Sequence, residues 1–97
     1  MAVIEVQNFR LAHGVEAAEF LDADKRLQTE LMLRKPTFLR RTTARGADGD
    51  WLVIVLWASQ ADADTSNAQF DRHPARVDFT ALVDEATVTW RRYETLD

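Results

Sequence analysis

Apolar residues alternate with polar ones, or form short continuous runs, in four segments of the chain. These segments are rich in β-branched and aromatic residues, as strands are, and they lie at 3–11, 37–45, 51–58 and 86–93. Between the second and the third, Asp48 and Gly49 form an Asp-Gly pair that readily adopts the positive φ angles of a tight hairpin loop. The pattern therefore predicts four strands, of which the second and third pair antiparallel.

Helix-forming residues occupy most of the remaining chain. They fill 15–33 without an internal Gly or Pro, and Pro36 prevents an easy continuation of that helix. A second helical region begins after Ser59, which resembles a capping box together with an Asp three residues later. That region is broken near His73, and the following proline suits the first turn of a further helical piece over 75–83.

The resulting order is strand, helix, strand, strand, helix, strand. A ferredoxin-like α+β fold satisfies this order with two split β-α-β units in one four-stranded antiparallel sheet. No internal repeat, low-complexity tract or linker interrupts the chain. We therefore expect residues 1–97 to form one domain, near the lower end of sizes that bury a sufficient core unaided.

The strand expected at 51–58 is apolar on both of its faces. Side chains alternate along a strand, so one face carries Trp51, Val53, Val55 and Trp57, and the other carries Leu52, Ile54, Leu56 and Ala58. Two helices cover only one side of such a sheet. We expect a second copy of the chain to cover the other side, giving a homodimer through the face that the helices leave open. The alternative is a strand that is merely rich in β-forming residues and is covered by loops.

Four stretches of sequence, together with the order of elements, resemble one superfamily of small proteins. They are VIEVQNFRLAHG, the hairpin FLRRTTARGADGDWLVIVLWAS, the break FDRHP and the closing strand VTWRRY. The chain is similar in these features to the dimeric α+β barrel superfamily, and within it to the antibiotic-biosynthesis-monooxygenase-like branch. Members of that branch include cofactor-independent oxygenases acting on aromatic polyketides, haem-degrading enzymes and many proteins without an established role.

The resemblance implies a small apolar or aromatic ligand between the sheet and the helices, and an enzyme that works without a bound cofactor. A recurrent polar group in that pocket is an Asn on the first strand, and Asn8 lies at a similar place. The tryptophan that family oxygenases often carry in the second helical region is absent from 61–70. The iron-ligating histidine of the haem degraders is matched only by His73, whose following proline disfavours a helical placement.

Two polar residues interrupt the apolar stripe of the first helix. At about 100° per residue, Asp24 and Gln28 fall in the middle of a stripe formed by Ala17, Phe20, Leu21, Leu27 and Leu31. One hypothesis makes them the polar end of an apolar pocket, with Asp24 as acceptor or general base and Gln28 orienting a carbonyl or hydroxyl group. The alternative is a structural ion pair between Asp24 and an arginine. Arg40 and Arg41 point to opposite faces of the second strand, so one of them faces the helices, and Arg40 is a candidate pocket residue.

Two further side chains are candidates for the site. Histidine is the usual general base near neutral pH, which favours His73, but a histidine beside a helix-starting proline is more often a loop or capping residue. Trp57 can line a pocket, although strand aromatics at a period of two are more often core. The sequence has no metal-ligand set, glycine-rich phosphate loop or serine triad, so we expect no metal site.

Composition and charge exclude several classes of partner. The formal net charge is -4, and the sequence has no basic stripe of the kind that phosphate binding requires, which argues against nucleic acid as a partner. Cysteine is absent, which excludes a thiol nucleophile and fits a reducing cytoplasm. No signal-peptide pattern opens the chain, and its longest apolar run, 51–58, is far short of the ~20 residues that a membrane-spanning helix needs. We expect a cytoplasmic protein without a membrane or nucleic-acid partner.

The resemblance implies, and the candidate residues are compatible with, a homodimeric small-molecule enzyme, namely a cofactor-independent monooxygenase acting on an aromatic or polyketide-like substrate. The alternative is a non-catalytic ligand-binding or stress-related dimer in which the network around Asp24 is structural. An open cavity touching Asp24 and Gln28 would favour the enzyme, and a carboxylate locked to an arginine would favour the alternative.

Overall fold

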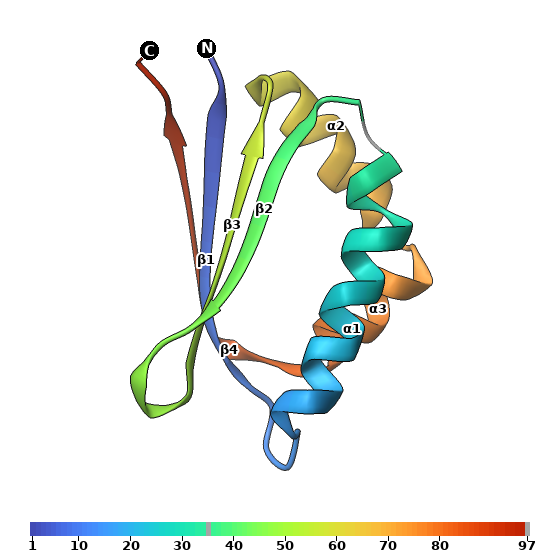
Figure 1. Cartoon of the computed structure of the whole chain (residues 1–97), viewed down its shortest axis with the longest axis vertical. Helices are drawn as coiled ribbons and strands as arrows, with labels where there is room; N and C mark the ends of the chain where they lie inside the picture. The colour runs from blue at the N-terminus through green and yellow to red at the C-terminus, as the bar shows by residue number, and fades with distance from the viewer. Residues whose placement is uncertain (35, 97) are drawn as a thin grey trace.

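The computed structural model describes residues 1–34 and 36–96, and its elements follow the order expected from the sequence (Figure 1). In that part of the chain, an antiparallel sheet of order β2-β3-β1-β4 is formed by β1 (Val3–Leu11), β2 (Phe38–Arg45), β3 (Asp50–Trp57) and β4 (Val83–Glu94). Its helices are α1 (Ala17–Glu30), α2 (Gln60–Phe70) and α3 (Pro74–Ala81). The ferredoxin-like α+β fold is thus confirmed.

The turn chemistry read from the sequence is also confirmed. In the loop between β2 and β3, Asp48 and Gly49 have φ of 57° and 79°. The hydroxyl of Ser59 accepts a hydrogen bond from the backbone N–H of Asp62 at 3.1 Å and caps α2. Each feature satisfies a local backbone requirement, which is why a short stretch of sequence was enough to predict it.

The end of the chain differs from the expectation. The third helical piece stops at Ala81, two residues early, and β4 begins at Val83 instead of residue 86. β4 pairs with β1 on both sides of a register shift between Asn8 and Arg10. At this shift the backbone N–H of Arg10 donates to the hydroxyl of Thr87 at 2.8 Å. The irregularity lets β4 start earlier, and hydrophobic alternation does not reveal it.

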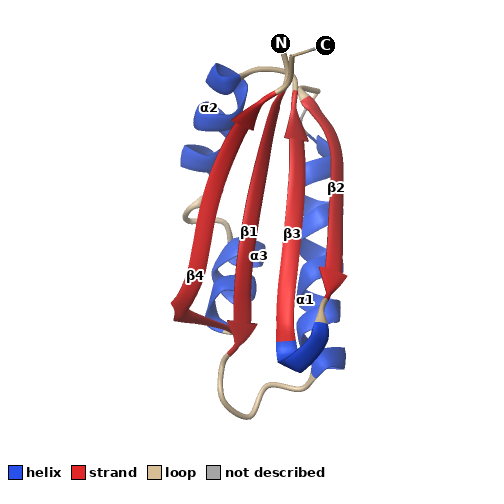
Figure 2. Ribbon diagram, turned by 90° about the vertical axis from the view of Figure 1, so that its left-hand side faces the viewer, coloured by secondary structure: helices blue, strands red, loops and turns tan. Residues whose placement is uncertain are grey.

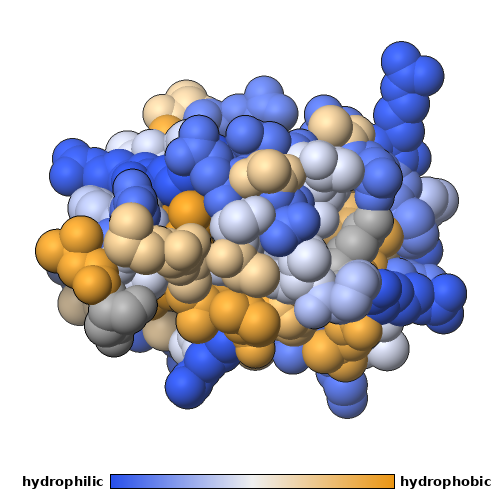
Figure 3. Space-filling view, turned by 90° about the horizontal axis from the view of Figure 1, so that it is seen from above, coloured by the Kyte–Doolittle hydropathy of each residue, from blue (hydrophilic) through white to orange (hydrophobic). Residues whose placement is uncertain are grey.

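All three helices lie on one face of the sheet, as Figure 1 shows in edge view. Figure 2 looks directly at the other face, on which the four strands lie uncovered in front of the helices. Seen from the end where both termini lie, the surface shows patches of hydrophobic residues among hydrophilic ones (Figure 3). No helix in residues 1–34 and 36–96 combines the length and the apolar character needed to span a membrane.

Aromatic rings fill one part of the space between the sheet and the helices. The ring centroid of Phe20 on α1 lies 4.8 Å from that of Trp51, 5.3 Å from that of Phe79 and 5.6 Å from that of Phe9. All four side chains are buried. Edge-to-face and tilted contacts of this kind add about 0.5–1.5 kcal/mol per pair beyond burial itself. The cluster fixes α1 and α3 against the sheet, and its Phe79 also lines the cavity described below.

Candidate functional site

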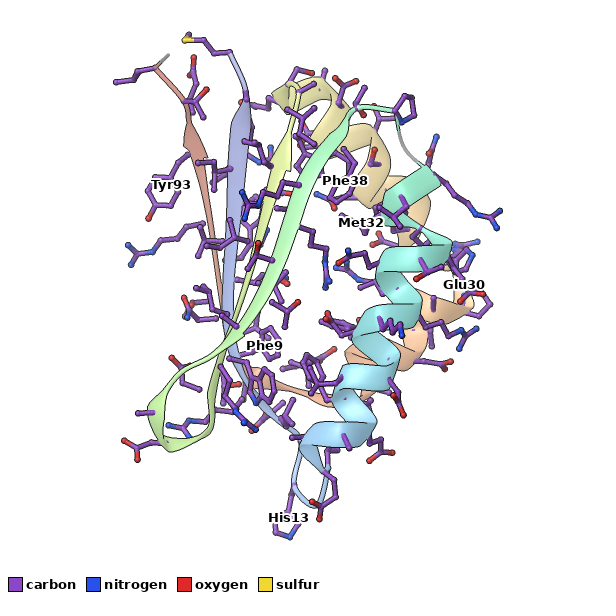
Figure 4. The ribbon with its side chains drawn as sticks, viewed as in Figure 1. Phe9, His13, Glu30, Met32, Phe38 and Tyr93 are labelled. Atoms are coloured by element: carbon purple, nitrogen blue, oxygen red, sulfur yellow. The ribbon has the colours of Figure 1, made fainter. Side chains whose placement is uncertain are left out.

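A cavity of about 260 Å³ lies between the sheet and the helices, toward the end of α1 where Met32 is labelled in Figure 4. Every strand and every α-helix of the described chain contributes to it. Its apolar walls are formed by Leu27, Met32, Val53, Val55, Phe70 and Phe79, with Trp57 and Trp90, and its polar lining consists of Glu5, Gln7, Arg41, Asn67 and Arg76. We call it the main cavity. Apolar walls with a few convergent polar groups are typical of small-molecule sites.

Glu5 is a carboxylate on the helix-covered face of β1, only 5% exposed. It accepts hydrogen bonds from Trp57 Nε1 at 2.6 Å, Asn67 Nδ2 at 3.1 Å and Arg92 Nη2 at 2.9 Å. Both of its oxygens are therefore occupied by N–H donors, and the carboxylate is badly placed to take a proton from a ligand. Its effect is to orient the indole of Trp57 and the amide of Asn67 in the cavity wall.

Arg92 of β4 completes this cluster from outside the cavity. Besides Glu5 it binds the exposed Asp64 at 2.7 Å, and its guanidinium lies 4.9 Å from the ring centroid of Trp90. Burial alone would lower the pKa of Arg92, but the hydrogen bonds and charges of the two carboxylates outweigh it, so the pKa is raised. Arg92 therefore holds its positive charge and anchors Glu5.

Asp24 and Arg41 form a buried ion pair beside the main cavity. Arg41 Nη2 lies 2.6 Å from Asp24 Oδ1, and the two residues are 9% and 8% exposed. Arg41 also donates to the hydroxyl of Thr43 at 3.3 Å, and its guanidinium lies 5.8 Å from the ring centroid of Phe79. The cavity touches Arg41 but neither Asp24 nor Gln28. Asp24 thus faces the sheet, as its spacing predicted, and it has the arginine-bound arrangement of the structural alternative.

Arg76 of α3 also lines the cavity, but unlike Arg41 it is not held by a carboxylate. In the part of the chain that the structure describes, no hydrogen bond or ion pair joins its guanidinium to a protein group. Burial lowers the pKa of Arg76, Asp71 and Glu5 oppose this shift from a distance, and the positive charge of Arg41 adds to it. Because arginine nonetheless stays charged at neutral pH, the cavity wall carries a partly buried cation without a counter-charge in contact.

The structure brings only one of the other sequence candidates to the cavity. Trp57 lines it, whereas Asn8 and Arg40 lie on the opposite face of the sheet, where Asn8 pairs with Leu52. His73 lies outside the lining, and its Nδ1 accepts a hydrogen bond from the backbone N–H of Ala75 at 3.1 Å, which caps α3. The expected site thus splits, because the alternation of β1 and β2 places Asn8 and Arg40 away from the helices.

Four polar residues of the observed site, Glu5, Gln7, Asn67 and Arg76, were not predicted from the sequence, and two of them show why. Glu5 occupies an inward position of β1 between the buried Val3 and Phe9. A charged residue at such a position of a predicted strand could have been recognised from the sequence as unusual. Arg76 offered no such signal, because α3 is short and its arginine has the sequence context of a surface residue. In the described residues, no cluster of three or more His, Asp or Glu side chains is arranged to hold a metal ion.

Solved structures share this fold over nearly the whole chain. SnoaB, a cofactor-independent oxygenase from Streptomyces nogalater, matches with a TM-score of 0.80 at 24% identity, covering 99% of this chain and 94% of that chain. A proposed antibiotic biosynthesis monooxygenase from Caulobacter crescentus CB15 matches with a TM-score of 0.82 at 15% identity, covering 99% and 91%. A dimeric ferredoxin-like protein of unknown function from Thermobifida fusca YX matches with a TM-score of 0.76 at 12% identity, covering 98% and 92%.

No protein-family model matches the sequence, and no curated protein sequence matches it significantly. At the identities above, the structural likeness shows the fold, which is the ferredoxin-like fold of proteins named as antibiotic biosynthesis monooxygenases. This agrees with the resemblance drawn from the sequence motifs.

Proposed function

We propose that the protein is a cofactor-independent oxygenase of electron-rich, phenolic aromatic compounds, and that the main cavity is its active site. The observation that carries the proposal is the cavity itself, about 260 Å³ with aromatic walls and two arginines, Arg41 and Arg76, in its lining. The fold shared with SnoaB, which is named as a cofactor-independent oxygenase, supports it. Trp57, Phe70 and Phe79 supply flat apolar surfaces that suit fused aromatic rings.

The chemistry needs no redox group from the protein, because an easily ionised substrate supplies the electrons. For an anthrone, two C–H bonds of the central CH₂ break, and one atom of O₂ forms the new C=O bond. The other oxygen atom leaves as water with both hydrogens, so the carbon loses four electrons and O₂ gains four. The protein's task is to favour the enolate form of the substrate and to exclude other reactions.

Arg41 is suited to stabilise such an enolate. Asp24 and Thr43 hold its guanidinium in one orientation inside the cavity lining. A cation fixed in advance stabilises developing negative charge without the cost of reorienting during the reaction. In this account Asp24 is a positioning residue that acts through Arg41, and it is not the general base of the sequence hypothesis.

Oxygen uptake tests the proposal. Purified protein with anthrone in air-saturated buffer is expected to form anthraquinone at least about tenfold faster than buffer alone, since even modest enzymes exceed that factor. Product mass should show two hydrogens replaced by one oxygen. Val55→Phe, which fills the cavity, should return the rate to background, whereas Ala68→Phe, which adds the same ring on the exposed side of α2, should not.

An absence of any acceleration, with anthrone and with dihydroxynaphthalenes alike, would overturn the oxygenase assignment. Binding of these compounds without turnover would favour the non-catalytic ligand-binding protein instead. The buried ion pair between Asp24 and Arg41 is the observation that keeps this second candidate in view, because it has the geometry of a structural clamp.

We also propose that the protein is a cytoplasmic homodimer joined through the uncovered face of the sheet. Ile4, Val6, Leu52, Ile54 and Leu56 lie on that face and are only partly buried in one copy of the chain. Tyr93 points the same way, away from the helices (Figure 4). A contiguous apolar surface of this kind is normally covered by a partner, and a two-fold arrangement of two identical sheets is the simplest cover.

A further inference from the structure

A second cavity adjoins the main cavity, and Arg76 lies at their junction. The second, which we call the side cavity, has a volume of about 280 Å³ and shares Gln7, Arg76 and Phe79 with the main cavity. Its remaining lining is contributed by Phe9, Thr80, Val83, Glu85 and Val88. The walls are mostly apolar, so an aromatic or aliphatic group of a ligand can extend from one cavity into the other past Arg76.

Charge pairing singles out Arg76 from its neighbours. Asp24 is paired with Arg41, and Glu5 is paired with Arg92, which also binds the exposed Asp64. For Arg76, no carboxylate of the described chain lies within ion-pair distance. Of the arginines that line the main cavity, Arg41 is thus paired, whereas Arg76 has no carboxylate of the described chain in contact.

The nearby carboxylates do not change this balance. The oxygens of Glu5 are occupied by Trp57, Asn67 and Arg92, as described above. Glu85 lines the side cavity and Asp71 lies beside an open hollow that Arg76 also borders, but both are exposed and neither is paired with Arg76. A carboxylate brought in by a ligand thus has no competitor already bound to this guanidinium.

A partly buried guanidinium without a partner is costly, and an incoming anion recovers that cost. Arginine presents paired N–H groups that match the two oxygens of a carboxylate, and such charge-assisted bonds are about twice as strong as neutral ones. A neutral ligand of the same shape fills the same apolar space but leaves Arg76 unpaired. Arg76 at the junction therefore favours a negatively charged ligand, and the two cavities together favour a long one.

We infer that the ligand of this protein is an extended aromatic carboxylate, whose acid group binds Arg76 while its apolar parts occupy the main and side cavities. The inference deepens the proposed function and rests on it only in taking the main cavity as the active site. Arg76 then sets substrate specificity, whereas Arg41 faces the reacting enolate.

Binding of a matched pair of probes tests the inference. The probes are 2-naphthoate and its neutral counterpart 2-naphthamide, measured by titration calorimetry on the full chain. The wild type should bind the acid at least about tenfold more tightly than the amide, as expected for a charge-assisted bond. Arg76→Gln should remove this preference and leave the affinity for the amide nearly unchanged. Arg72→Gln, which removes an exposed charge in the turn before α3, should keep the preference.

Equal affinities for acid and amide in the wild type would overturn the inference, as would the failure of both to bind below about 1 mM. A preference that survives in Arg76→Gln would also overturn it, because the anion would then bind elsewhere. Circular dichroism on each variant confirms that the fold is kept. These outcomes are independent of oxygen uptake, so acid binding at Arg76 without turnover would uphold the inference while rejecting the oxygenase.

Discussion

The two faces of the sheet differ in how far their charged residues are buried. The helix-covered face buries charged groups, and Glu5, Asp24 and Arg41 are all at most 9% exposed there. The uncovered face carries aliphatic side chains together with two exposed arginines, Arg40 and Arg91. The charges under the helices are buried and paired, whereas the arginines of the uncovered face are exposed. The comparison supports the proposed ligand site on the helix-covered face and the proposed dimer interface on the uncovered one.

The largest effect should come from breaking the buried ion pair. Asp24→Ala leaves Arg41 buried without its counter-charge, so the free energy of unfolding should fall by about 3–5 kcal/mol in urea denaturation. The double variant Asp24→Leu with Arg41→Met should regain most of this loss. Asp22→Ala, on the exposed side of α1, is the control. A loss no larger than that of the control would show that water reaches the pair.

The next effect concerns the uncovered face. Ile54→Asp puts a carboxylate in the middle of the proposed dimer interface, where it should weaken association about a hundredfold because a charged group would have to lose its water on binding. Sedimentation velocity at micromolar concentration should then show a monomer in place of the wild-type dimer. Thr65→Asp on the exposed side of α2 should leave the dimer intact. A wild-type monomer under these conditions would reject the interface.

A smaller loss is expected at the Glu5 cluster. Trp57→Phe removes one of the three hydrogen-bond partners of Glu5 while Asn67 and Arg92 remain, so unfolding free energy should fall by about 1–3 kcal/mol. Trp90→Phe, at a residue 48% exposed, should cost less. The reverse ranking of the two variants in thermal or urea unfolding would mean that the Glu5 cluster is not a stabilising network.

The smallest loss of stability is expected at the start of α2, which lies outside both the main cavity and the uncovered face of the sheet. Ser59→Ala removes the hydroxyl that caps the helix and should cost about 1 kcal/mol. Ser59→Thr keeps the capping hydroxyl, which can still donate to the carboxylate of Asp62, and should cost less. Equal losses in the two variants would show that the cap is not what stabilises this helix end.

The elements were predictable because each followed from a local pattern. The strands, the hairpin at Asp48 and Gly49, and the cap at Ser59 depend on residues close in sequence. The early start of β4 was not predictable, because it depends on a register shift against β1, some 75 residues away in the chain. Local patterns therefore gave the fold, and long-range pairing corrected its edges.

The site was predictable only in part. Helical spacing placed Asp24 on the inner face, and alternation left open which of Arg40 and Arg41 would meet it; the structure assigns Arg41. Asn8 was assigned to the pocket by the family resemblance alone. Because side chains alternate along β1, it lies on the uncovered face with Leu52. Arg76 could not be recognised from the sequence, because only the three-dimensional structure shows which charged groups lie near its guanidinium.

The tryptophan side chains offer the most direct measurement of the central claim, that the helix-covered face holds a ligand site. Trp57 and Trp90 line the main cavity, whereas Trp51 lies in the aromatic cluster outside it. In a ¹H–¹⁵N NMR titration with 2-naphthoate, the indole N–H signals of Trp57 and Trp90 should shift with one saturating curve while that of Trp51 moves least. Shifts confined to Trp51, or no shift at saturating ligand, would contradict the account.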